Sequence, residues 1–256
     1  IGRATSGAAN GLLGKVFLTQ QQYGEAVNAL NAVINSGEYN LMPTVAEVFD
    51  PANEYGPEIL FAVVFTTADL AEDHNLFFSS AIGDNIEPSF RAIYEEGDER
   101  AAMIELITPP NTATVVPAKY FEPLSGDGTV GTDFPVLRYA DVLLMAAEAL
   151  NEQGYQASGQ AFMLLNMVRT RAGLPAYTAN DLADQAAFRD AVLLERNLEF
   201  PLELHRWYDL LRTDRAIEAM AAVGFNIDQN DLLFPIPNSQ FLIYNNPSGF
   251  PQNPGY

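Results

Sequence analysis

Two predicted helical hairpins, far apart in the sequence, constrain the fold most strongly. In residues 8–34, small and large apolar residues recur at helical spacing along two consecutive segments. They are Leu13, Gly14, Phe17, Tyr23, Ala26, Leu30 and Val33. The same arrangement returns in residues 138–173, at Ala147, Leu150, Gly154, Ala161, Leu165 and Val168. Small residues let paired helices approach closely, so each segment is predicted to be a helix pair whose outer face needs a neighbour.

This spacing is typical of a tetratricopeptide unit, a helix pair of roughly 34 residues. The turn position that usually holds glycine is Gln21, and Ser36 and Gly37 close the second helix. The residues between the two pairs do not continue the repeat, as expected when a helical scaffold carries a binding region on loops. The predicted fold is therefore mostly α, with tetratricopeptide-like helical pairs and a large loop-rich insertion.

Within one domain spanning residues 1–256, the boundaries follow from these patterns. We expect a helical pair at 8–34, an insertion at 40–134, a helical scaffold at 135–222 and an extended C-terminal tail at 223–256. The tail is predicted to be extended because Pro235 and Pro237 exclude a central strand.

The insertion contains a short apolar run followed by a polar stretch with adjacent aromatic residues. Residues 59–66, ILFAVVFT, are β-branched, aromatic and apolar, which predicts a buried strand or extended segment. His74 and Asn75 then precede Phe77 and Phe78. Exposed rings stack on the C–H faces of sugars and amides bind sugar hydroxyls, so these four residues are candidate ligand-binding residues. The alternative is that Phe77 and Phe78 belong to the core.

Residues 191–220 contain the only tryptophan of the chain. On a helix, Leu204, Trp207, Tyr208 and Leu211 would form one apolar stripe, with Arg206, Asp209 and Arg212 pointing elsewhere. One helix earlier, an apolar face carries two carboxylates beside Arg196. Its members are Phe188, Val192, Glu195 and Glu199. Carboxylates in such a face need cationic partners.

Three interpretations of these carboxylates are open. In the first, Glu195 and Glu199 belong to a structural network and are neutralised by Arg196, Arg206 or other arginines. In the second they are glycosidase catalysts, but such a pair faces across a cleft rather than along one helix. In the third they bind a metal with Glu203 and His205, although the spacing of the last two is not Glu-x-x-His.

The composition excludes several classes of partner and chemistry. With 33 acidic and 13 basic residues, the formal charge of −20 opposes binding to nucleic acid or to anionic membranes. We hypothesise that this acidic surface is adapted to salt; an ordinary acidic extracellular protein is the alternative. The chain has no cysteine and no phosphate loop, and we expect neither a cofactor nor a metal. No apolar run approaches the length that spans a membrane.

Several motifs resemble those of the SusD/RagB family. The stretch ERNLEF…HRWYDLLR is similar to the family signature ERR-x-ELAFEG-x-RW-x-DL-x-R. The matching residues are Glu195, Arg196, Glu199, Arg206, Trp207, Asp209, Leu210 and Arg212. Asn197 and the run Phe200-Pro201-Leu202 depart from it. Similar motifs lie at RYADVLLMAAEALNE, LNMVRTRAGLP, YEEGDER and the closing QNPGY. They include Arg138, Glu148, Arg169 and Arg171, for which we predict interhelical ion pairs rather than ligand contacts or catalysis.

The resemblance implies a fold and a role. Such proteins are lipoproteins on the outer surface of the outer membrane of Bacteroidetes-type bacteria. They capture oligosaccharides without turnover and hand them to a SusC-like TonB-dependent transporter. We expect this chain to be the C-terminal portion of a longer protein whose lipid anchor lies outside these residues. A RagB-like peptide-binding protein and a tetratricopeptide adaptor for protein partners are the alternatives.

Overall fold

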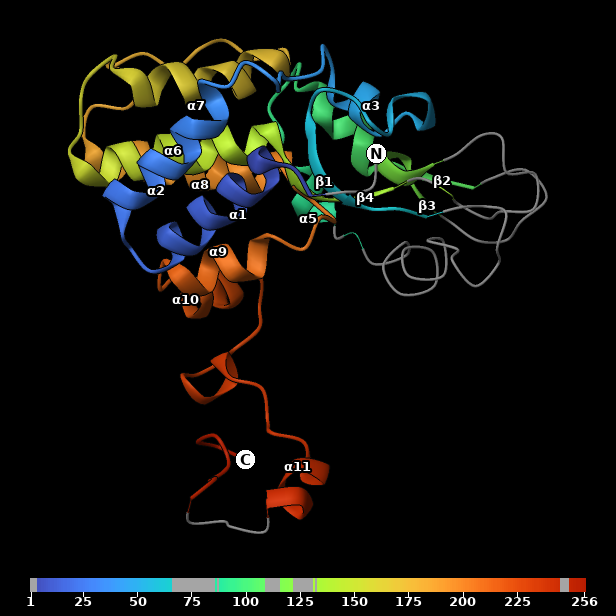
Figure 1. Cartoon of the computed structure of the whole chain (residues 1–256), viewed down its shortest axis with the longest axis vertical. Coiled ribbons are helices and arrows are strands. Elements are labelled where there is room, and N and C mark those ends of the chain that lie inside the picture. The colour runs from blue at the N-terminus through green and yellow to red at the C-terminus, as the bar shows by residue number, and fades with distance from the viewer. Residues whose placement is uncertain are drawn as a thin grey trace. The chain divides into compact units, whose positions relative to one another are not determined.

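The computed structural model describes residues 4–65, 86, 88–108, 116–121, 131, 133–244 and 249–256. The chain forms two compact units that divide between Glu203 and Leu204. Most of the regular structure is helical, which confirms the predicted fold class (Figure 1). No helix in these ranges is long and apolar enough to cross a membrane.

Five helices form the scaffold of the first unit. They are α1 (Ser6–Thr19), α2 (Tyr23–Ile34), α6 (Tyr139–Gln153), α7 (Gln160–Arg171) and α8 (Gln185–Glu199). Helix α1 packs on α2, α2 packs on α6, and α6 packs on both α7 and α8 (Figure 1). Every residue of α6 from Tyr139 to Ala149 is buried. The two hairpins, distant in sequence, therefore share one core with α6 at its centre.

Close packing within the first hairpin depends on a glycine. A Cβ atom added to Gly14 would lie 2.5 Å from Cδ2 of Leu30, so a larger side chain at residue 14 would push α1 and α2 apart. The turn between the helices is tight, and Gln21 adopts the left-handed conformation there with φ 58°. Glycine would occupy that conformation with little strain, which explains why glycine is usual at this turn position.

A two-stranded antiparallel sheet joins residues 59–63 of the insertion to the point where it returns to the scaffold. Strand β1 (Ile59–Val63) pairs with β4 (Phe134–Arg138), with Ile59 opposite Arg138 and Val63 opposite Phe134. The side-chain carboxylate of Asp133 also accepts a hydrogen bond from the backbone N–H of Phe65 at 3.0 Å. These contacts fix residues 59–65 to the end of the insertion.

Of the predicted buried strand or extended segment at residues 59–66, residues 59–63 form the extended strand β1, but this strand is not buried as a whole. In β1 only Leu60 is buried, while the side chain of Val63 is 47% exposed. The difference arises because only the face of β1 that carries Leu60 packs against the core, while Phe61 and Val63 on the opposite face are exposed.

The rest of the described insertion consists of short elements. These are α3 (Val45–Val48), η1 (Pro51–Asn53), α5 (Pro88–Arg91), η4 (Glu99–Ile104), η5 (Ala118–Tyr120), and the paired strands β2 (Leu106–Ile107) and β3 (Val116–Pro117). Tyr120 packs with Val45, Val48 and Phe49 in a second, smaller core cluster. The described insertion thus has apolar packing of its own in addition to its contacts with the scaffold.

The second unit contains α9 (Arg206–Arg212), α10 (Ala216–Ala222), η6 (Asn230–Leu232) and α11 (Asn238–Tyr244). The predicted apolar stripe on this stretch is wrong. Helix α9 begins at Arg206, so Leu204 precedes it in a left-handed turn with φ 62°, and Tyr208 is 66% exposed. The buried residues of α9 are Asp209 and Leu210.

The tail, residues 223–256, is not extended throughout, because it contains η6 and α11. No strand forms around Pro235 and Pro237, in keeping with the loss of backbone donors at proline.

Candidate functional site

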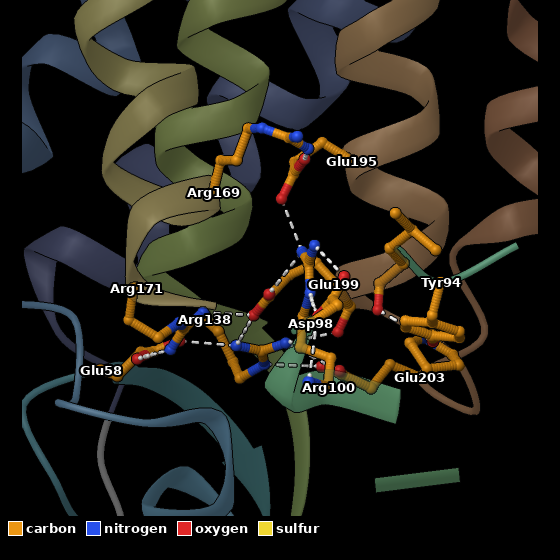
Figure 2. Close-up of polar contacts among 12 residues, drawn as sticks. Glu58, Tyr94, Asp98, Arg100, Arg138, Arg169, Arg171, Glu195, Glu199 and Glu203 are labelled. Atoms are coloured by element: carbon orange, nitrogen blue, oxygen red, sulfur yellow. Dashed lines mark hydrogen bonds and ion pairs between the residues drawn. The ribbon is translucent and has the colours of Figure 1, made fainter. Parts of the chain in front are cut away.

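A buried cluster of charged side chains lies where the insertion meets the scaffold (Figure 2). Arg138, the last residue of β4, occupies its centre and is 1% exposed. Its Nε and Nη2 atoms donate to the two carboxylate oxygens of Glu203, each at 2.8 Å. Its Nη1 donates to Glu58 at 2.6 Å and to Glu199 at 2.9 Å. One guanidinium therefore joins the start of β1, the end of α8 and the turn after α8.

Arg100, in η4, anchors the middle of the insertion to α8. It donates to both oxygens of Asp98, at 2.9 and 2.8 Å, and Asp98 also caps η4 by accepting from the backbone N–H of Arg100. Nη1 of Arg100 lies 2.6 Å from Glu195 and 3.4 Å from Glu199. The two carboxylates, one helical turn apart on α8, therefore point at a cation supplied by the insertion (Figure 2).

The last turn of helix α7 contributes two more arginines to the cluster. Arg171 pairs with Glu58 at 3.0 Å and with Glu199. Arg169 pairs with Glu95 at 2.8 Å, lies 3.7 Å from Glu195, and stacks over the ring of Tyr177 at 3.9 Å. These contacts place both arginines in ion pairs between α7 and α8, and between α7 and the insertion.

Lys119 holds the turn that follows α8. Its Nζ donates to Glu203 at 2.6 Å and to the backbone carbonyls of Pro201 and Glu199 at 3.0 and 3.3 Å. The hydroxyl of Tyr120 donates to the carbonyl of Leu202, which has φ 65°. Left-handed leucine is strained, so these buried donors hold a turn that the local sequence does not favour.

The charges of the cluster are strongly perturbed by burial and by one another. Burial raises the pKa of the Glu199 carboxyl, but Arg171, Arg138 and Arg100 outweigh it and lower this pKa to about 2. Burial raises the pKa of Glu195, which Arg100 opposes only in part. Burial also lowers the pKa of Lys119 to about 8 despite the nearby Glu203 carboxylate. The cluster is therefore buried and strongly ionic, and its stability depends on the pairing of its charges.

Some predicted members of the network have other partners. The Arg196 guanidinium donates to Asp141 at 2.7 Å, and Asp141 also binds Lys15 at 2.9 Å. Glu148 is buried on α6. Arg206, Trp207 and Asp209 belong to the second unit, where Asp209 binds Arg212 at 2.8 Å. The partners of Glu195 and Glu199 in the first unit are Arg100, Arg138, Arg169 and Arg171.

This geometry suits packing rather than acid–base chemistry. Glu195 and Glu199 lie on one helix face with their oxygens bound by arginines, whereas glycosidase carboxylates face each other across a cleft. In the described ranges, no group of three or more His, Cys, Asp or Glu side chains is arranged to hold a metal ion.

The candidate ligand-binding residues His74, Asn75, Phe77 and Phe78 lie outside the described residues. Described residues on both sides of their segment are fixed to the first unit, by the β1–β4 pairing before it and by Tyr94 and Arg100 after it. The hydroxyl of Tyr94 donates to the carbonyl of Leu198 on α8 at 3.2 Å. The described residues that flank the candidate segment are therefore held by strand pairing on one side and by contacts with α8 on the other.

Sequence reasoning did not assign four members to the cluster. Two of them, Asp98 and Arg100, were noted only within the motif YEEGDER. The other two, Lys119 and Glu58, had a usable signal, because each is a lone charge beside apolar residues, in VVPAKYF and PEILFAV. A charge in such a context needs a buried partner. The partners, however, are 84 and 80 residues away in the chain, so the pairing itself could not be read from the sequence.

Comparisons with known proteins agree on one family. The sequence model of the SusD family matches residues 102–256 of this chain. SusD-like protein P2 of Formosa agariphila is 27% identical over 303 residues, covering 95% of this chain and 58% of the relative. SusD-like protein P38 of the same organism is 34% identical over 111 residues, covering 41% of this chain and 22% of the relative. The chain thus spans little more than half of P2 and less of P38.

Solved structures have the same fold. A SusD superfamily protein from Parabacteroides distasonis superposes with a TM-score of 0.81 at 24% identity, covering all of this chain and 64% of that one. Surface glycan-binding protein A from Bacteroides thetaiotaomicron, in complex with laminarihexaose, superposes with a TM-score of 0.77 at 20% identity, covering 98% of this chain and 64% of that one.

Proposed function

Because this chain belongs to the SusD family, we propose that it captures an oligosaccharide at the cell surface without chemically converting it. The observation that carries the proposal is the likeness of its fold to surface glycan-binding protein A, one structure of which holds laminarihexaose. The role requires a scaffold that holds a variable, ligand-facing insertion in a fixed orientation. The cluster around Arg138 and Arg100 provides such a base.

The binding residues we propose are His74, Asn75, Phe77 and Phe78. Phenylalanine rings would cover the C–H faces of sugar units, and the amide and imidazole would bind hydroxyls. Each such contact is weak, so affinity would come from aromatic area and repeated sugar units rather than from one charged anchor.

Calorimetric titration of this chain with soluble hexasaccharides, laminarihexaose among them, tests the proposal. We expect saturable binding of at least one sugar, weakened about tenfold or more by Phe77→Ala or Phe78→Ala, since each tenfold is about 1.4 kcal/mol. Phe234→Ala is the matched control, because Phe234 is 81% exposed in the second unit. Absence of saturable binding by every sugar would refute the proposed function. Equal losses in all three variants would refute only the proposed residues.

We further propose that the captured sugar passes to a SusC-like TonB-dependent transporter at the outer surface of the outer membrane. Labelling of intact cells with an antibody to this chain tests the location, and co-purification from detergent-extracted outer membranes tests the partner. Labelling only after cell lysis would contradict the proposed location. Purification without such a transporter would contradict the proposed partner.

A further inference from the structure

The turn that follows α8 is held by side chains from outside the helix. A helix leaves its last carbonyl groups without donors from its own backbone, and a glycine after the helix usually lets the chain fold back to satisfy them. Residues 200–205, FPLELH, contain no glycine. The turn therefore needs donors from elsewhere in the fold.

Element η5 of the insertion supplies such donors. The ammonium group of Lys119 donates to the carbonyl of Pro201 at 3.0 Å, and the hydroxyl of Tyr120 donates to the carbonyl of Leu202 at 3.3 Å. Lys119 also pairs with the carboxylate of Glu203 at 2.6 Å. The side chain of Leu202 packs against the apolar cluster that contains Tyr120. Hydrogen bonds, an ion pair and apolar packing therefore all join η5 to the turn.

Two leucines in this turn have strained backbones. Leu202 and Leu204 are both left-handed, with φ 65° and 62°. In this conformation the Cβ atom crowds the following carbonyl oxygen. Leu204 is 55% exposed, so burial of its side chain offsets little of this strain. A strained backbone persists only while the surrounding contacts hold it, so the turn should relax when η5 leaves it.

Element η5 is itself tied to the rest of the described insertion. The backbone N–H of Ala118 donates to the carbonyl of Glu105, at the end of η4, at 2.7 Å. The pairing of β2 with β3 joins the same two segments. Element η4 in turn contacts α8 through Arg100 and Glu195. A displacement of this part of the insertion would therefore carry η5 with it.

We propose that η5 is a latch on the turn at residues 200–205, and that latch and turn open and close as one conformational switch. While η5 is docked, the turn keeps its strained conformation; when η5 leaves, the turn relaxes. The second unit begins at Leu204, so a change in the insertion is passed to the residues that lead into that unit. Such coupling is reciprocal, and relief of strain in the turn must also tighten the docking of η5.

Hydrogen exchange of single backbone amides in the 256-residue chain, followed by nuclear magnetic resonance, tests the latch. The amide of Glu203, hydrogen-bonded within the turn at 3.2 Å, reports on the turn. Lys119→Met should make it exchange at least about tenfold faster, while the amide of Leu144, in the middle of α6, changes by less than about twofold. Lys15→Met is the matched control, because Lys15 is the only other lysine and pairs outside the turn. It should change the Glu203 rate by less than about twofold.

The variant Leu204→Gly tests the reciprocity and leaves the contacts of η5 in place. Glycine adopts φ 62° without strain, so the Glu203 amide should exchange about threefold more slowly. If latch and turn form one switch, the Ala118 amide in η5 should slow by the same factor. Val223→Gly is the matched control, because Val223 is 61% exposed and has an ordinary φ of −105°. It should slow neither amide.

Three results would overturn the proposal. In the first, Lys119→Met accelerates exchange at Glu203 and at Leu144 alike, so that Lys119 contributes only to global stability. In the second, Lys119→Met and Lys15→Met have equal effects on the Glu203 amide. In the third, the Ala118 amide does not slow in Leu204→Gly, so that the turn is not coupled to the insertion. If Lys119→Met does not fold, the third measurement decides.

Discussion

Replacing Arg138 by methionine should be among the most damaging single changes in this chain. Methionine keeps the length of an unbranched side chain, but it removes the guanidinium that lies over the Phe200 ring and the ion pairs with Glu58, Glu199 and Glu203. Removing one partner of a buried ion pair costs about 3–5 kcal/mol. Here Arg171 still contacts Glu58 and Glu199, and Lys119 still contacts Glu203, so we expect about 3–4 kcal/mol. For a chain of this size, that lowers Tm by roughly 6–16 °C.

The assay is urea unfolding at pH 7 followed by far-ultraviolet circular dichroism, whose signal comes mainly from the helices. Arg189→Met is the matched control, because Arg189 and Glu152 form a pair with the arginine 32% exposed. A pair of that kind is worth about 0–1 kcal/mol. The double variant Arg138→Met/Glu203→Gln should lose less than the sum of its single changes, because it removes both ends of the bidentate contact. If Arg138→Met costs no more than Arg189→Met, the cluster does not hold the insertion on the scaffold.

Three further predictions concern the same scaffold. Gly14→Val should destabilise the fold by about 1–3 kcal/mol through overpacking, whereas Gly24→Ala, with no atom near the added Cβ, should be neutral or slightly stabilising in thermal unfolding. Gln21→Gly should stabilise by up to about 1 kcal/mol by relieving φ 58°, while Gln22→Gly, at φ −87°, should not; equal effects would contradict the strain argument. The folded-state pKa of Glu199 is about 2, below its ordinary value of 4.5, so its ionised form stabilises the fold above about pH 4.5. This contribution, about 3 kcal/mol, is lost as the pH falls from 4.5 to 2, and an unfolding free energy for Glu199→Gln as steep in acid as that of the parent chain would refute it.

The spacing of apolar residues was sufficient to predict the helices of the two hairpins. The periodic small and large residues of 8–34 and 138–173 do form α1, α2, α6 and α7, because a helix with one apolar face depends on residues three or four apart. The same pattern failed in 204–211, where the helix starts two residues later than the stripe requires and Leu204 occupies a left-handed turn. Apolar spacing does not report where a helix begins.

The sequence by itself determined that Glu195 and Glu199 share an apolar face of one helix and need cations, and that this acidic chain has few cations to offer. Only the tertiary structure decided which cations these are. Arg100 reaches Glu195 across 95 residues of sequence, Arg138 reaches Glu199 across 61, and Arg196, next to Glu195 in sequence, turns instead to Asp141. The physical reason is that a carboxylate on an apolar helix face will be buried and therefore needs a cation, and this can be recognised from neighbouring residues. Which cation pairs with it depends on which distant segments of the chain pack together.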